Sequence, residues 1–152
     1  MNRSLRLRLP VVAAAVTASL VAAGCGSSGN GGSGGSAAAS VPGITKTQIL
    51  IGSHQPLTGP AAPGYSEIAP AANAYFQYVN SKGGIYGRKI KYTYLDDAYD
   101  PSKTVSVVHQ LVLQDNVFGI FNGLGTPTHL AVVKYLNSAK VPNLFIASGC
   151  DC

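Results

Sequence analysis

Residues 100–121 read DPSKTVSVVHQLVLQDNVFGIF, and this stretch decides the fold class. Asp100 is a good N-cap and Pro101 suits the first helical position, so we expect a helix to begin here. Valines at positions 105, 108 and 112 recur at helical spacing and mark its buried face. The apolar run 117–121 follows and predicts a buried strand. A helix that leads directly into a buried strand is typical of an α/β protein.

The same alternation extends in both directions from this stretch. Toward the N-terminus, residues 49–53 and 89–95 predict strands, and they flank a helix over 66–82 that Gly83 and Gly84 end. Toward the C-terminus, Thr126 and Pro127 open a third helix before a strand over 141–147. The order β-α-β-α-β-α-β predicts an open parallel sheet with helices on both faces. The buried faces of the first and third helices are expected to carry Ile68, Ala72, Tyr75, Phe76 and Val79, and Leu130, Val133 and Leu136, respectively.

Three loops of this fold are candidates for ligand binding, because open sheets bind ligands beyond the carboxyl ends of their strands. They read HQPLTGPAAPGY (54–65), NGLGTPT (122–128) and SGCDC (148–152). In the second loop, Gly123 and Gly125 would let the backbone approach a ligand, and the helix start beyond them would attract an anion. Thr128 stands where a dinucleotide fingerprint has its third glycine. A carboxylate at Thr126 is therefore favoured over a nucleotide, with a helix-capping role for Thr126 as the alternative.

The remaining polar residues predict structural roles. Asp96, Asp97 and Asp100 form the acidic cluster, but too few further oxygen ligands accompany them to build a cation cage. His54, at the mouth of the first strand, could line a pocket. His109 and His129 are expected near the surface, and the three histidines show no metal-ligand spacing.

No nucleophile, base and orienting group can be assembled around Ser148 or Cys150. Cys150 and Cys152 with Asp151 between them fall short of four zinc ligands, and a disulfide between the two cysteines would be strained. The sequence therefore predicts no catalytic residue, no metal and no cofactor.

The N-terminal residues predict export. Residues 1–24 have the layout of a signal peptide, in which Arg3, Arg6 and Arg8 precede an uncharged run too short to span a bilayer. Loss of these arginines lowers the formal net charge from +5 to +2. No basic patch with interleaved aromatic residues indicates a nucleic-acid partner.

LVAAGC (20–25) resembles the lipobox of bacterial lipoproteins, so Cys25 is expected to carry lipid. Ala22 stands where a leucine is usual, and cleavage without lipidation is the alternative. Residues 25–43 would then form a lipidated, disordered Gly/Ser tether. We expect the folded part, residues 44–152, to be held at the extracytoplasmic face of the cell membrane.

Several motifs in the folded part occur together and in a fixed order. They are PLTGPAA (56–62), NAYFQYVNSKGGIYGRKIKYTYLDDAYDP (73–101) and NGLGTPTHLAVVKYLNSAKVPNLF (122–145). Together they resemble the N-terminal lobe of type I periplasmic solute-binding proteins of ABC transporters, in the leucine/isoleucine/valine-binding branch.

This resemblance implies a ligand site. Thr126, with the backbone of Leu124 and Gly125, would hold the ligand's carboxylate, and Tyr65 would form a wall. The loop after the fourth strand would add Gly149, Cys150 and Asp151. Some family members link two of these loops by a disulfide, whose positions here are Tyr99 and Gly125, so that bridge is absent.

The resemblance also implies a function. A monomeric solute-binding lipoprotein would capture a branched-chain amino acid or related small amide between two lobes and deliver it to an ABC permease. An α/β hydrolase or other enzyme, or a ligand-sensing receptor on the same fold, is the alternative. Because the sequence supplies one incomplete lobe, we expect weak binding or none by this chain alone.

Overall fold

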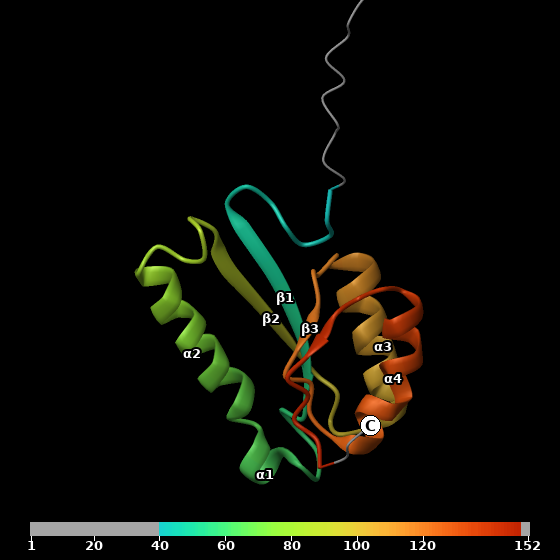
Figure 1. The fold of residues 1–152 in the computed structure, drawn as a ribbon. Helices are drawn as coiled ribbons and strands as arrows, with labels where there is room; N and C mark the ends of the chain where they lie inside the picture. Colours follow the sequence, from blue (N-terminus) through green and yellow to red (C-terminus); the bar gives the residue numbers. More distant parts are fainter. Residues whose placement is uncertain (1–39, 150–152) are drawn as a thin grey trace, which may run out of the picture. The chain divides into compact units, whose positions relative to one another are not determined.

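The computed structural model describes residues 40–149, which form a four-stranded parallel sheet with helices on both faces (Figure 1). The strands are β1 (Gln48–Gln55), β2 (Lys89–Asp96), β3 (Ile120–Phe121) and β4 (Asn143–Leu144), in the spatial order β2-β1-β3-β4. The predicted fold class is confirmed. The strand order reverses at β1, which places the expected ligand site beyond the carboxyl ends of β1 and β3.

The helices divide between the two faces of the sheet. α2 (Ile68–Ser81) covers one face, while α3 (Pro101–His109) and α4 (Thr126–Ser138) cover the other (Figure 1). A single turn, α1 (Ala62–Tyr65), precedes α2, and α3 continues into a π-helical turn, η1 (Gln110–Gln114). The third and fourth strands are shorter than the sequence predicted, since ladder pairing covers two residues in each.

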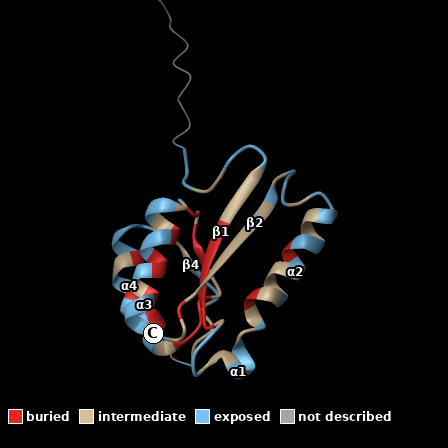
Figure 2. Cartoon of the chain, turned by 180° about the vertical axis from the view of Figure 1, so that it is seen from behind, coloured by how far each residue is buried: buried red, intermediate tan, exposed pale blue. Residues whose placement is uncertain are grey.

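The larger core lies between α3, α4 and the sheet, where the buried residues line the inner faces of the two helices (Figure 2). Burial of apolar side chains contributes about 25 cal/mol per Å² of surface removed from water, so this layer is the main source of stability in the lobe. Its fully packed members are Val107, Val108, Leu111, Val117, Ile120, Val132 and Leu136.

The second layer, under α2, is aromatic. The Phe76 ring meets the rings of Tyr92 and Phe121 edge-on, with centroids 5.3 and 5.2 Å apart. Tyr75, expected on the buried face, is instead 63% exposed, because Ala69 and Phe76 set the inward stripe of the helix. Burial raises the pKa of the Tyr92 hydroxyl.

Leu130 on α4 is likewise 53% exposed, against the prediction. The inward stripe of α4 consists of Thr128, His129, Val132 and Leu136, so its first turn buries polar side chains. A search for apolar periodicity passes over such a stripe because half of it is not apolar.

The predicted helix ends are confirmed. The Asp100 carboxylate accepts a hydrogen bond from the Lys103 N–H at 2.9 Å and caps α3. Gly83 and Gly84 follow α2 with positive φ, and the Gly84 N–H donates back to the Val79 carbonyl at 3.0 Å.

The residues predicted to form a signal peptide, Cys25 and most of the predicted tether lie outside the described residues, as do Cys150, Asp151 and Cys152. Across residues 40–149, the helices are too short or too polar to cross a membrane.

Candidate ligand-binding site

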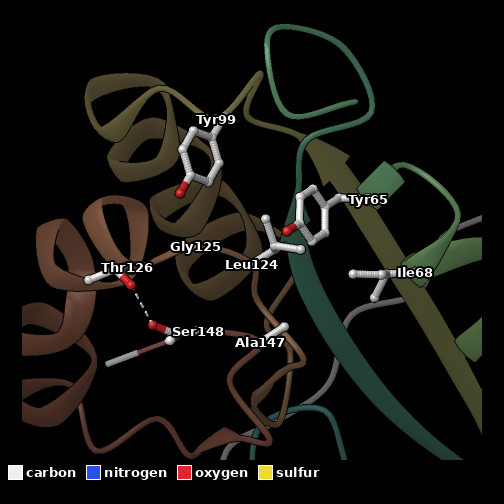
Figure 3. Close-up of a pocket in the computed structure, with 9 residues that line it drawn as sticks. Tyr65, Ile68, Tyr99, Leu124, Gly125, Thr126, Ala147 and Ser148 are labelled. Atoms are coloured by element: carbon white, nitrogen blue, oxygen red, sulfur yellow. Dashed lines mark hydrogen bonds between the residues drawn. The ribbon is translucent and has the colours of Figure 1, made fainter. Parts of the chain in front are cut away.

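A cavity of about 280 Å³ opens at the carboxyl end of the sheet (Figure 3). Four loops, one after each strand, contribute to its walls. This is the position that the reversal of strand order predicts for a ligand. The lining residues are Tyr65, Ile68, Tyr99, Leu124, Gly125, Thr126, Ala147, Ser148 and Gly149.

The start of α4 forms the polar part of this cavity. Gly125 has φ 105° and ψ 141°, so the chain turns sharply into the helix at Thr126. No side chain caps α4 there. The Thr126 hydroxyl instead lies 2.8 Å from the Ser148 hydroxyl, across the cavity wall (Figure 3). Thr126 is therefore not the helix cap that the sequence left as an alternative.

The backbone N–H groups near the start of α4 differ in their hydrogen-bond partners. The Gly125 N–H donates to the Ala147 carbonyl at 2.9 Å, and the Leu124 N–H to the His54 carbonyl at 3.4 Å. These two donors join the loop after β3 to the end of β1 and to the loop after β4. The N–H groups of Thr126 and Thr128 have no partner within a helix, whereas Pro127 carries no N–H and the His129 N–H donates to the Gly125 carbonyl at 3.0 Å. The N–H groups of Thr126 and Thr128 are the backbone groups suited to an anion at this site.

Tyr99 narrows the cavity from the loop after β2, a role that the sequence did not predict. A Cβ placed on Gly125 would overlap the Tyr99 ring, so the ring rests directly on the glycine backbone. These are the two positions at which the family resemblance noted an absent disulfide. The structure brings them together with an aromatic packing contact where a covalent bond would otherwise stand.

The Tyr99 loop is held in an unusual conformation. Ala98 and Tyr99 both have positive φ, at 52° and 61°, which costs backbone free energy in residues other than glycine. Asp96 accepts the Ala98 N–H at 3.0 Å, and Asp97 accepts the Tyr99 N–H at 2.9 Å. The acidic cluster is thus structural, as predicted.

Asp96 also ties this loop to its neighbours. Its carboxylate accepts hydrogen bonds from the Thr58 hydroxyl at 2.6 Å and from the Lys103 ammonium at 2.9 Å. Burial opposes ionisation, but these hydrogen bonds outweigh it and hold the pKa of Asp96 well below its ordinary value.

A buried polar pair lies beneath the cavity. His54 is fully buried, and its Nδ1 lies 2.8 Å from the Asp97 carboxylate, which also accepts the Thr104 hydroxyl at 3.0 Å. A Cβ on Gly123 would overlap the His54 ring, so the imidazole supports the loop after β3 from below. The sequence left open that His54 lines a pocket. In the structure it does not line the cavity and is not placed to act on a ligand.

His129 is 2% exposed, which corrects its predicted surface position. Its Nδ1 lies 3.1 Å from the Asn143 amide. Burial lowers the pKa of His129, and the nearby His54 lowers it further. His109 is exposed as expected, beside the Tyr135 ring. Among residues 40–149, no group of three or more acidic, histidine or cysteine side chains could hold a metal ion.

The structure gathers five of the predicted site residues around one cavity: Tyr65, Leu124, Gly125, Thr126 and Gly149. Cys150 and Asp151, the other two, lie outside the described residues, as does the lipidation candidate Cys25. Sequence reasoning missed Ile68, Tyr99, Ala147 and Ser148. Of these, Tyr99 could have been predicted, because it stands at the position of a cysteine that some family members link to the position of Gly125.

A family model described as periplasmic binding protein matches residues 48–151. The Leu/Ile/Val-binding protein homolog 2 of Brucella abortus is 36% identical over 89 residues, which are 57% of this chain and 24% of that protein. The fatty acid ABC transporter substrate-binding protein from Thermomonospora curvata is similar with a TM-score of 0.61 and 35% identity, over 72% of this chain and 27% of that chain.

A third similar protein is a solute binding protein of an ABC transporter from Rhodopseudomonas palustris, solved in complex with 3,4-dihydroxy benzoic acid. It has a TM-score of 0.56 and 31% identity, over 67% of this chain and 28% of that chain. The present chain thus spans about a quarter of the length of these three relatives.

Proposed function

Since this chain belongs to the periplasmic binding protein family, we propose that it contributes one wall of a ligand site for a small carboxylic acid taken up by an ABC importer. The family is one of substrate-binding proteins and not of enzymes. Branched-chain amino acids and related small molecules are the first candidates as ligands, because the curated relative is a Leu/Ile/Val-binding protein homolog.

One observation carries this proposal: the hydroxyl and the backbone N–H of Thr126, at the N-terminus of α4, border the same cavity. A carboxylate suits such a group of donors, since hydrogen bonds to a charged acceptor are the stronger ones and a helix N-terminus favours negative charge. The three similar proteins are consistent with this chemistry, because leucine, a fatty acid and 3,4-dihydroxybenzoic acid each carry a carboxyl group.

The remaining walls suit the rest of such a ligand. Ile68, Leu124 and Ala147 offer apolar contacts, and the Tyr65 and Tyr99 rings extend over the cavity with their hydroxyl groups (Figure 3). Tyr65 is 50% exposed, so this lobe leaves the ligand open to solvent on one side. The volume of about 280 Å³ is just under the lower end of the range for small-molecule pockets, about 300–1,000 Å³. Weak binding by this chain alone follows from both features.

Saturation-transfer NMR tests the proposal, because it detects weakly bound ligands. We expect signals from leucine, octanoate and 3,4-dihydroxybenzoate, and weaker ones from leucinamide, which lacks the carboxylate. Thr126→Val should weaken binding about tenfold, the loss of a hydrogen bond to a charged group. Thr47→Val, an exposed threonine outside the cavity, is the matched control. Equal binding of leucine and leucinamide, or equal effects of the two variants, would overturn the carboxylate site.

Cys150 and Asp151 belong to the same proposal, as contributors from the loop after β4. Capture between two lobes, delivery to a permease and a monomeric state complete it. Delivery to the permease is tested in the transporter context, where deletion of neighbouring permease genes should abolish ligand uptake without changing ligand binding.

We also propose that Cys25 is the lipidated N-terminus of the exported protein. Labelled fatty acid should be incorporated on expression in a bacterium, and Cys25→Ser should abolish that incorporation. A signal of equal strength in Cys25→Ser would show that another residue carries the lipid.

A further inference from the structure

The amino end of the sheet carries a second hollow, remote from the ligand cavity. It measures about 620 Å³ and includes residues 44–46, which precede β1, whereas the ligand cavity begins at Tyr65, after β1. Strand β1, whose eight residues span about 26 Å, runs between the two ends of the sheet. Its lining residues are Ser40, Val41, Ile44, Thr45, Lys46, Tyr86 and Arg88.

Tyr86 is the most unusual residue of this surface. It lies in a tight turn in which Ile85 and Arg88 exchange backbone hydrogen bonds of 2.8 and 3.0 Å. Tyr86 and Gly87 both have positive φ, at 49° and 78°, as in the two central positions of a type I′ turn. Asparagine and glycine suit such positions, and a bulky aromatic residue there is strained.

Nothing within the lobe offsets this strain, because the Tyr86 side chain is 93% exposed. Two further apolar residues are exposed around the same hollow: Val41 at 49% and, in the turn itself, Ile85 at 40%. A strained, exposed aromatic residue beside exposed aliphatic ones indicates a contact outside the lobe.

Positive charge surrounds these apolar side chains. Lys46 and Arg88 line the hollow, and Lys89 and Lys91 are exposed at the start of β2. No acidic residue lines the hollow, and the two ion pairs among residues 40–149 involve other side chains. Lys46 lies far from Arg88 in the sequence, so the fold alone gathers this cluster.

We propose that this amino-end surface, formed by Val41, Lys46, Ile85, Tyr86 and Arg88, binds the headgroup region of an anionic lipid bilayer. Tyrosine rings favour that region because one edge is apolar and the other is polar, and lysine and arginine are attracted to anionic headgroups. A single-stranded nucleic acid would need several aromatic residues for stacking, and this surface offers only Tyr86.

The point at which the N-terminal segment joins the lobe is consistent with a membrane at this surface. Ser40, the first described residue, lines the hollow, so the N-terminal segment joins the lobe at this surface. Contact with lipid here would direct the ligand cavity, at the other end of β1, away from the bilayer. The proposal does not depend on which ligand that cavity holds.

Tryptophan fluorescence tests the proposal, because the chain contains no tryptophan and a single substitution gives a local probe. Tyr86→Trp reports on the amino-end surface, and Tyr65→Trp, at the ligand cavity, is the matched control in the same full chain. With vesicles of phosphatidylglycerol and phosphatidylcholine, we expect a blue shift for the probe at position 86 and none for the probe at position 65. The shift should decrease as salt is added.

Charge reversal separates this surface from other membrane contacts, since the apolar N-terminal segment is present in every variant. In the Tyr86→Trp chain, Lys46→Glu with Arg88→Glu should weaken the vesicle affinity at position 86 more than tenfold, because each cation near an anionic surface contributes about fivefold. Lys134→Glu with Lys140→Glu makes the same change of charge outside the surface and should leave the shift in place. Equal shifts at positions 65 and 86, a shift that both charge reversals reduce equally, or the same response to an oligonucleotide would overturn the proposal.

Discussion

The two ends of the sheet differ in where the chain places its polar groups. At the carboxyl end, Asp97, His54 and Thr104 are fully buried and bonded to one another, and they support loops with strained backbone. At the amino end, Lys46, Lys89 and Lys91 stay in solvent. Burying a polar group is unfavourable unless it is hydrogen-bonded, so the carboxyl end depends on a network that the amino end does not need. The same kind of substitution should therefore change the stability of the fold by different amounts at the two ends.

The largest difference is expected between two glycines with positive φ. Gly125→Ala would force a Cβ into the Tyr99 ring at a φ of 105°, whereas Gly87 has open space around it at a φ of 78°. We expect Gly125→Ala to lower the free energy of unfolding by about 3 kcal/mol, from backbone strain and overpacking together. Gly87→Ala should cost about 1 kcal/mol, from strain alone. Urea denaturation measures both, and equal losses would show that Tyr99 does not pack on Gly125.

Two histidines give the next difference, in pH dependence. His129 lies in the first turn of α4 and has a lowered pKa, so the folded state binds fewer protons than the unfolded state. Its contribution to stability is complete above the ordinary pKa of 6.5 and is lost as the pH falls below that value. His129→Gln should flatten the decline in stability between neutral and mildly acidic pH.

His109 is the control for this experiment, because it is exposed at the far end of α3. His109→Gln should leave the decline unchanged. If the stability of His129→Gln still declines to the same extent with falling pH, other groups cause the decline.

The smallest difference is expected between two hydrogen-bonded threonine hydroxyls at opposite ends of the sheet. Thr58 donates to Asp96 at 2.6 Å at the carboxyl end, and Thr45 accepts the Gln48 N–H at 2.9 Å at the amino end. Each alanine variant should cost about 1 kcal/mol near neutral pH.

The two threonine variants differ in how their cost in stability depends on pH. The lowered pKa of Asp96 means that its hydrogen bonds stabilise the fold above the ordinary value of 3.8 and stop doing so as the carboxylate is protonated. The cost of Thr58→Ala should therefore fade in strong acid, while that of Thr45→Ala persists. A cost of Thr58→Ala that does not depend on pH would contradict the role of the Asp96 charge.

Sequence patterns were sufficient for the order of elements, the caps at Asp100 and Gly83, and the parallel sheet, because these depend on local chemistry and on hydrophobic runs. The family resemblance is confirmed by the match over residues 48–151. Five of the site residues that it implied line one cavity. The burial of His129 could not be predicted, because a polar residue becomes buried only when distant segments surround it. The cluster of Lys46 with Arg88 was missed for the same reason.

The carboxyl end of this lobe is proposed to bind a small carboxylic acid at the start of α4. Protein-observed ¹⁵N–¹H NMR of the full chain during a leucine titration tests it most directly. We expect amide shifts at Thr126, Thr128 and Ser148, none at Tyr86 or Arg88, and smaller shifts with leucinamide. Shifts confined to the amino end, or identical shifts with leucinamide, would contradict it.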